Sequence, residues 1–137
     1  MSASPPNTFS VYKNKPFARF AKKARITDAD LWKAAVSANE GIVDADLGGN
    51  VFKQRIARPG EGKSGGSRTL LLLRRGERAV YVFGFEKKNL ANISAKELLV
   101  YRELATIYLD CSIAEIERRV EAGAMIEVEP LQGDEHA

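Results

Sequence analysis

Positively charged side chains are concentrated in the middle of the chain, among residues typical of β-strands. The stretch 51–89 contains ten of the 21 lysines and arginines and only three acids, so its net charge is +7. Lys53 and Arg55 share one face of a predicted strand, Val51–Ala57, and Arg68 begins the next predicted strand. Closely spaced cations on a small sheet attract phosphates. The pattern predicts a face that binds a polyanion.

The same residue types could support RNA cleavage without a metal ion. In that reaction the 2′-OH attacks its own phosphate, which requires a proton acceptor, a proton donor and stabilisation of the charged phosphorane. The sequence has no His, Cys, Asp or Glu cluster with metal-ligand spacing, and its single histidine, His136, lies in the C-terminal tail. Cations remain as candidates: Arg68 as the stabiliser and Lys53 as an acid or base. Glu86 is the nearest carboxylate that could act as a base.

The segment Ala57–Ser64, ARPGEGKS, matches a relaxed form of the phosphate-binding loop of nucleotide-binding proteins. That motif works when a helix begins immediately after it and directs N–H groups at the phosphates. Here two more glycines and a β-type run follow, which argues against nucleotide hydrolysis. We expect residues 58–67 to form a flexible, glycine-hinged lid beside the sheet, with Arg58 and Lys63 exposed to bind RNA.

Two helices are expected before the basic stretch in the sequence and two after it, each with a recognisable start. They begin near Asn14, Thr27, Ser94 and Ser112. Ser94 and Ser112 each precede a glutamate by three residues, which is the pattern of a capping box. The second helix should end at 39–41, and the third should continue to about Leu109.

Five β-type runs are expected to form the sheet. They are Thr8–Tyr12, Val51–Ala57, Arg68–Leu73, Ala79–Phe85 and Met125–Val128. Residues 69–73 are apolar on both faces, which predicts a central strand. Strict alternation in the fourth run places Tyr81, Phe83 and Phe85 together on one face, as core residues. An exposed aromatic ring beside the cations would instead suit base stacking.

Two further groups of residues have simpler interpretations. Arg74, Arg75 and Arg78 surround a predicted turn, where arginines are usually solvated charges. Tyr81 is the one tyrosine of the basic stretch and therefore the one considered for a catalytic role.

The chain as a whole has the length and composition of one domain. Its 137 residues suffice for a hydrophobic core, and we expect flexible tails at residues 1–7 and 130–137. No apolar run reaches membrane-spanning length, and none near the start has the features of a secretory signal. Cys111 is the single cysteine, which excludes an internal disulfide and suits a reducing cytosol. We therefore expect a cytoplasmic protein without a membrane partner or a cofactor.

Two combinations of residues resemble those of the RelE/HigB family of type II toxin–antitoxin toxins. They are GKSGG-x-RT, from Gly62 to Thr69, and FGFEK-x-x-x-ANI, from Phe83 to Ile93. The similarity covers roughly residues 8–128. It implies an α+β fold in which a small twisted, mainly antiparallel sheet packs against an N-terminal helical pair, with further helices toward the C-terminus.

The resemblance also implies an activity, partners and a site. Toxins of this family are expected to cleave messenger RNA on the ribosome and to be neutralised by a tightly bound antitoxin, here expected to be a small helix-turn-helix DNA-binding protein. Arg68 occupies the place of the family's most recurrent catalytic arginine, and Lys53 and Arg55 match basic positions on the preceding strand. Lys87 and Lys88 lie where other members have a basic or aromatic group after the last long strand, and we expect them to bind RNA.

Two other functions remain open from the sequence. One is a basic RNA- or DNA-binding module that keeps the fold without nuclease activity. The other is a gyrase-poisoning toxin of the same superfamily. The density of lysine and arginine on adjacent strands favours RNA cleavage over gyrase poisoning.

Overall fold

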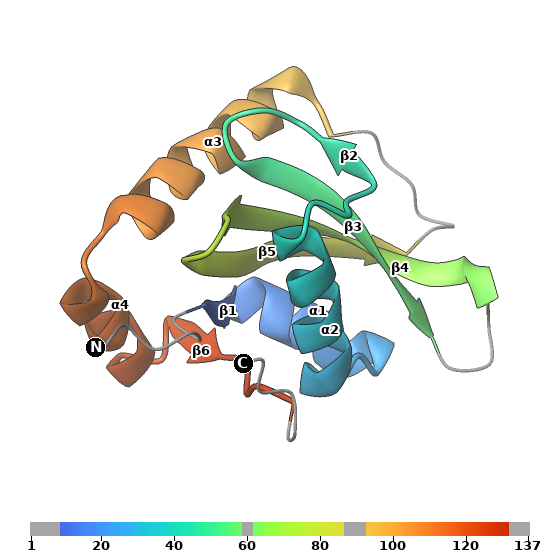
Figure 1. Ribbon diagram of the computed structural model, residues 1–137, viewed down its shortest axis with the longest axis horizontal. Helices are drawn as coiled ribbons and strands as arrows, with labels where there is room; N and C mark the ends of the chain where they lie inside the picture. The colour runs from blue at the N-terminus through green and yellow to red at the C-terminus, as the bar shows by residue number, and fades with distance from the viewer. Residues whose placement is uncertain (1–8, 59–61, 87–92, 132–137) are drawn as a thin grey trace.

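The computed structural model describes residues 9–58, 62–86 and 93–131 of the chain (Figure 1). Its strands are β1 (Ser10–Asn14), β2 (Ala45–Asp46), β3 (Val51–Arg58), β4 (Gly62–Arg74), β5 (Arg78–Glu86) and β6 (Met125–Glu127). Its helices are α1 (Lys15–Ala24), α2 (Asp28–Asn39), α3 (Ala95–Asp110) and α4 (Ile113–Glu121). The strands form one sheet in the order β2-β3-β4-β5-β1-β6. Every pairing is antiparallel except that of β1 with β5, so the mainly antiparallel α+β fold is confirmed.

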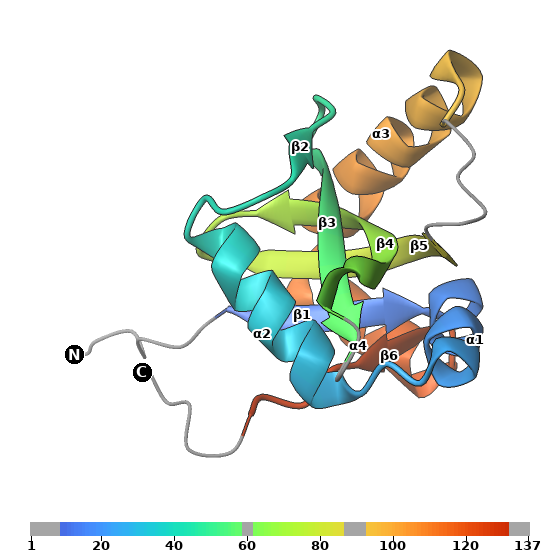
Figure 2. The same ribbon diagram turned by 90° about the vertical axis from the view of Figure 1, so that its right-hand side faces the viewer.

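Helices cover both faces of the sheet (Figure 2). The N-terminal pair, α1 and α2, packs on one face and forms a hydrophobic cluster with Leu71, Leu73 and Tyr81. Helices α3 and α4 pack on the other face and form a second cluster with Leu70 and Leu72. These four leucines of β4 are at most 2% exposed, as predicted for a central strand that is buried on both sides.

The helices begin where the sequence predicts them. Asn14 and Thr27 cap α1 and α2, and Ser94 and Ser112 form capping boxes at the starts of α3 and α4. In the box of α3, the Ser94 Oγ accepts from the Glu97 N–H while a Glu97 carboxylate oxygen accepts from the Ser94 N–H, both at 3.1 Å. These local bonds satisfy N–H groups that the helix itself cannot use, which explains why the starts are readable from sequence.

Two boundaries differ from the expectation. The first strand runs from Ser10 to Asn14, two residues later than predicted. The predicted lid at residues 58–67 is wrong for its second half, because residues 62–67 belong to β4 and Ser67 pairs with Ile56 on β3. Gly62, Gly65 and Gly66 are therefore part of a strand and do not hinge a loop. Residues 59–61 lie outside the described parts, as do those beyond Leu131 in the expected C-terminal tail.

The turn between β4 and β5 holds the ends of helices on both faces. Arg75 donates from Nε to the Asn39 carbonyl oxygen at the end of α2, at 2.8 Å. Arg74 and Arg78 donate to carbonyl oxygens in the last turn of α3. Arg74 donates to that of Leu109 at 2.9 Å, and Arg78 donates to that of Tyr108 at 2.7 Å. Helix C-termini leave such carbonyls without an internal partner. The interpretation of these arginines as solvated charges is therefore wrong.

A β-bulge interrupts the pairing of β4 with β5. Leu71 pairs with Tyr81, but Leu70 pairs with Phe83, so Val82 is an extra residue on β5. The extra residue reverses the alternation, and Phe83 points to the face opposite Tyr81. The predicted placement of all three aromatic residues on one face is wrong for this reason.

Gly84 is required by the close approach of α1 to β5. It faces α1, and a Cβ atom at this position would lie 2.3 Å from the Phe20 ring and 3.1 Å from the Phe17 ring. The helix therefore approaches the strand more closely than any side chain at position 84 would allow.

We predict that Gly84→Ala lowers the free energy of unfolding by about 1–3 kcal/mol, because the Phe20 ring must leave its place in a packed cluster. Chemical denaturation of the variant and the wild-type protein measures the difference. Gly76→Ala is not a suitable control, because Gly76 has a positive φ at which alanine strains the backbone. Ala34→Gly on α2 shows instead how much a change of helix propensity alone costs. A Gly84→Ala protein as stable as the wild type would show that α1 shifts without cost.

Candidate nucleic-acid interface

Three cations and two aromatic rings lie on one part of the sheet, next to the region that α3 covers. Lys53 pairs with Leu70, which pairs with Phe83 on the next strand. Arg55 pairs with Arg68, which pairs with Phe85. Directly paired residues point to the same face of a sheet, so these side chains form two adjacent rows. The predicted association of Lys53, Arg55 and Arg68 follows from this register.

The side chains of this face are partly accessible to solvent. Lys53, Arg55 and Arg68 are each half-buried, whereas Phe83 is 37% exposed. Long basic side chains can rest their methylene groups on a surface while the charged group reaches water. The face can therefore offer positive charge and an aromatic surface to the same ligand.

Arg68 lies on β4, the strand that is buried between the helices of both faces. It lies two residues before Leu70 on the same strand, and its Nη1 donates to the Gly66 carbonyl oxygen at 3.4 Å. That contact uses one of the five N–H donors of a guanidinium, a planar group that matches phosphate oxygens in pairs.

Asp44 hydrogen-bonds to the backbone of β3 on both sides of Gln54. The Arg55 N–H donates to the Asp44 carboxylate at 2.6 Å, and the Asp44 N–H donates to the Lys53 carbonyl oxygen at 3.0 Å. These bonds extend the contact with β3 to the residue before β2, and they hold the backbone that carries the two basic side chains.

An aromatic row runs from the sheet to α3. The Phe83 ring centroid lies 5.8 Å from that of Phe85 and 6.0 Å from that of Tyr101. Burial, together with the Glu97 carboxylate, raises the pKa of Tyr101 above its ordinary value. The raised pKa keeps the hydroxyl protonated, so it can donate a hydrogen bond. Sequence reasoning missed Tyr101, because its place depends on how α3 returns across the sheet.

Arg102 fixes that return of α3. Its guanidinium donates to the carbonyl oxygens of Leu47 and Gly48 in the turn before β3, from Nε to Gly48 at 3.3 Å. Gly49 lies against the aliphatic part of the same side chain, where a Cβ atom would be 2.7 Å from the Arg102 Cγ. The glycines of the turn thus allow the helix to approach the sheet.

Tyr81 and Glu86 do not belong to this face. The Tyr81 hydroxyl is buried on the α1–α2 side and donates to the Leu31 carbonyl oxygen at 2.7 Å, and burial raises its pKa. Glu86 pairs with Ser67 and lies with Phe20 and Lys23 around a hollow beside α1. The register therefore removes both as candidates for proton transfer near Arg68.

Of the four other predicted RNA-binding residues, the structure describes the backbone position of two. Arg58 ends β3, and Lys63 is the second residue of β4, so both belong to the far end of the β3–β4 pair. Lys87 and Lys88 lie outside the described residues.

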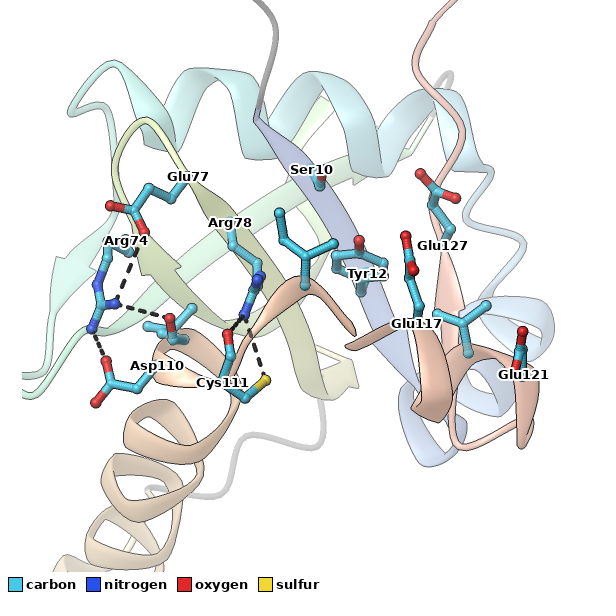
Figure 3. Close-up of a pocket in the computed structure, with 13 residues that line it drawn as sticks. Ser10, Tyr12, Arg74, Glu77, Arg78, Asp110, Cys111, Glu117, Glu121 and Glu127 are labelled. Atoms are coloured by element: carbon cyan, nitrogen blue, oxygen red, sulfur yellow. Dashed lines mark hydrogen bonds and ion pairs between the residues drawn. The ribbon is translucent and has the colours of Figure 1, made fainter. Parts of the chain in front are cut away.

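A hollow of about 690 Å³ lies elsewhere, between β1, the β4–β5 turn, the end of α3, and α4 (Figure 3). Its two arginines, Arg74 and Arg78, already bind the end of α3. The carboxylates around it are those of Glu77, Asp110, Glu117, Glu121 and Glu127. An acidic lining repels phosphates, so we exclude this hollow from the nucleic-acid interface.

Two findings concern the described residues as a set. In residues 9–58, 62–86 and 93–131, no three His, Cys, Asp or Glu side chains converge in a way that could hold a metal ion. Nor does this part of the chain contain a helix that is long and apolar enough to cross a membrane.

We predict that Tyr81→Phe lowers the free energy of unfolding by about 1 kcal/mol at neutral pH, because it removes one buried hydrogen bond. The raised pKa adds a pH dependence. The folded protein holds the Tyr81 proton more tightly than the unfolded chain, so this stabilisation is complete below pH 10.0, the ordinary pKa, and is lost as the pH rises above it. Denaturation at increasing alkaline pH should therefore show a smaller loss of stability in the variant than in the wild type. An equal loss in both would mean that Tyr81 is not the group responsible.

A comparison with protein families places the chain. A family model described as the RelE toxin of the RelE/RelB toxin–antitoxin system matches residues 9–128. No curated protein matches the chain significantly. The match includes every strand and helix of the fold and all three cations of the candidate face. The chain belongs to the RelE toxin family, and it is the toxin of a toxin–antitoxin system whose partner is a cognate antitoxin.

Proposed function

We propose that this toxin is a ribosome-dependent endoribonuclease that cleaves messenger RNA without a metal ion and thereby inhibits translation. One observation carries the proposal: the register of β3, β4 and β5 brings Lys53, Arg55 and Arg68 together on an accessible face beside the exposed Phe83. Single-stranded RNA presents phosphates and unstacked bases together, and these match cations and an aromatic ring.

In the proposed reaction, the 2′-oxygen of a nucleotide forms a bond to the adjacent phosphorus while the bond to the 5′-oxygen breaks. The proton of the 2′-OH passes to a base, and the leaving 5′-oxygen receives a proton. Arg68 stabilises the charge that develops on the phosphate oxygens, and Arg55 adds positive charge beside it. Lys53 serves as the acid or base. The products are a 2′,3′-cyclic phosphate and a 5′-hydroxyl.

Dependence on the ribosome suits the composition of the face. Its three cations stabilise charge and bind phosphates, but they do not by themselves align the 2′-oxygen with the phosphorus. Much of the rate must then come from holding the RNA with its 2′-oxygen aligned for attack, and a ribosome that grips the messenger would supply that alignment.

Further residues and partners complete the proposal. Arg58, Lys63, Lys87 and Lys88 extend the contact along the RNA backbone, and residues 8–128 act as one domain in the cytoplasm. The cognate antitoxin is proposed to be a small helix-turn-helix DNA-binding protein.

We predict that expression of the toxin without its antitoxin stops growth and translation. RNA sequencing should reveal new messenger 5′ ends inside coding regions, and plasmid supercoiling should remain normal. Relaxed plasmids with intact messengers would indicate a gyrase poison instead. Normal growth at high expression would favour a nucleic-acid-binding module without nuclease activity.

We predict that Arg68→Ala lowers the rate of messenger cleavage on programmed ribosomes by about 10²–10³-fold, as loss of one charge-stabilising donor typically does. Arg68→Lys should restore activity only in part, because an ammonium keeps the charge but loses the planar fork. Arg19→Ala is the matched control, since Arg19 is exposed on α1, on the opposite side of the sheet. Full activity of Arg68→Ala would remove Arg68 from the site, and unfolding of that variant would make its role structural.

A further inference from the structure

The β-bulge at Val82 determines which face of the sheet receives Phe83. Without the extra residue, alternation from Tyr81 would direct Phe83 under α1 and α2, into the hydrophobic cluster. With it, Phe83 points to the face of Lys53 and Arg68. Bulges are frequent beside active sites, where they change the direction of a side chain.

Packing alone does not account for this arrangement. The bulge leaves Phe83 37% exposed, while Val82 is 3% exposed within the α3–α4 cluster. An aromatic side chain in water forgoes much of the free energy that its burial would provide. The exposed ring is held between the rings of Phe85 and Tyr101, at 5.8 and 6.0 Å. The neighbouring rings therefore hold the Phe83 ring in place, and the bulge in the backbone determines the face on which it is exposed.

Asn14 ties the bulge to the start of α1. Its Oδ1 accepts from the Phe17 N–H at 2.9 Å and caps the helix, while its Nδ2 donates to the Val82 carbonyl oxygen at 3.4 Å. One side chain thus satisfies a helix terminus and a carbonyl at the irregular position of β5. Gly84, the next residue to face α1, lets Phe20 pack against the strand.

We propose that Phe83 is the nucleobase-stacking platform of this site, and that Asn14 is the residue that positions it through the bulge. This inference rests on the proposed RNA-binding face and adds how a base is held there. Lys53 and Phe83 are separated by β4, so their backbones lie roughly 10 Å apart, two strand spacings. A bound strand can then place a phosphate on the lysine and a base on the ring.

The ligand class follows from the chemistry of the ring. Every base has a π-face, so the platform takes any single-stranded nucleotide and discriminates mainly by stacking strength. Duplex RNA keeps its bases stacked on one another and offers none to the ring. The site should therefore prefer unpaired RNA to a duplex of the same charge.

The test compares two probes that differ only in their bases. One is a short single-stranded 2′-O-methyl RNA, which lacks the attacking hydroxyl, and the other has the same sugar–phosphate backbone without bases. Fluorescence anisotropy at low salt measures both affinities. Phe83→Leu should weaken binding of the base-bearing probe on the order of 5- to 100-fold, and leave binding of the abasic probe unchanged. Phe83→Trp should retain the affinity of the wild type for both probes.

Two controls separate stacking from charge and from general surface effects. Lys53→Ala should weaken binding of both probes by the same factor, because it removes a phosphate contact. Leu99→Ala alters an apolar side chain on α3 that is 58% exposed, and should change neither affinity.

Asn14→Asp tests the positioning role. The carboxylate keeps the acceptor that caps α1 but loses the donor to the Val82 carbonyl. Its affinity for the base-bearing probe should fall, by less than that of Phe83→Leu, with no loss for the abasic probe. Equal weakening of both probes by Asn14→Asp would mean that Asn14 has only a structural role.

The outcomes also separate this inference from the proposed nuclease. If Phe83→Leu affects both probes equally or neither, while the wild type cleaves messenger RNA on programmed ribosomes, the stacking platform is refuted and the nuclease stands. If the wild type prefers the base-bearing probe and loses that preference in Phe83→Leu, but never cleaves, the nuclease is refuted and the platform stands. A wild type that binds neither probe refutes the platform and the RNA-binding face together.

Discussion

The burial of β4 on both faces is the constraint on which the structure depends. Leu70 to Leu73 alternate between the two hydrophobic clusters, so helices must cover both sides of the sheet. Two residues before Leu70, the same face of the same strand carries Arg68. A slip of one residue in the pairing would turn the leucines over and bring Arg68 to the α1–α2 side, where an unpaired charge is costly. The core thus fixes the register that assembles the cations.

Much of the fold is readable from local patterns. Helix starts depend on a few neighbouring residues, as at Thr27 and Ser94, and the apolar run of β4 predicts a central strand by itself. The predicted lid failed because glycine frequency was taken as a sign of a loop, whereas Gly62 pairs with Arg58 on β3, and Ser67 pairs with Ile56 on β3 and Glu86 on β5. The turn arginines were misjudged because their partners lie 30 or more residues away in sequence.

The placement of the basic side chains in the candidate site could be predicted from the sequence, but the placement of its aromatic side chains could not. Lys53 and Arg55 stand on a regular strand, so alternation alone places them on one face. Phe83 was assigned to the wrong face because one additional residue, Val82, reverses the pattern, and nothing in the sequence distinguishes it from its neighbours. Tyr101 depends on the path of α3, which is set by the contact of Arg102 with a distant turn.

The β4–β5 turn has a consequence for how this chain can change over evolution. Short turns at the surface are usually the places where insertions are tolerated best. Here Arg75 binds the end of α2, and Arg74 and Arg78 bind the end of α3, so five consecutive residues join layers on opposite sides of the sheet. An added residue would break both attachments at once. Variation in length should therefore be rare at this turn, and new sequence should accumulate in other connections.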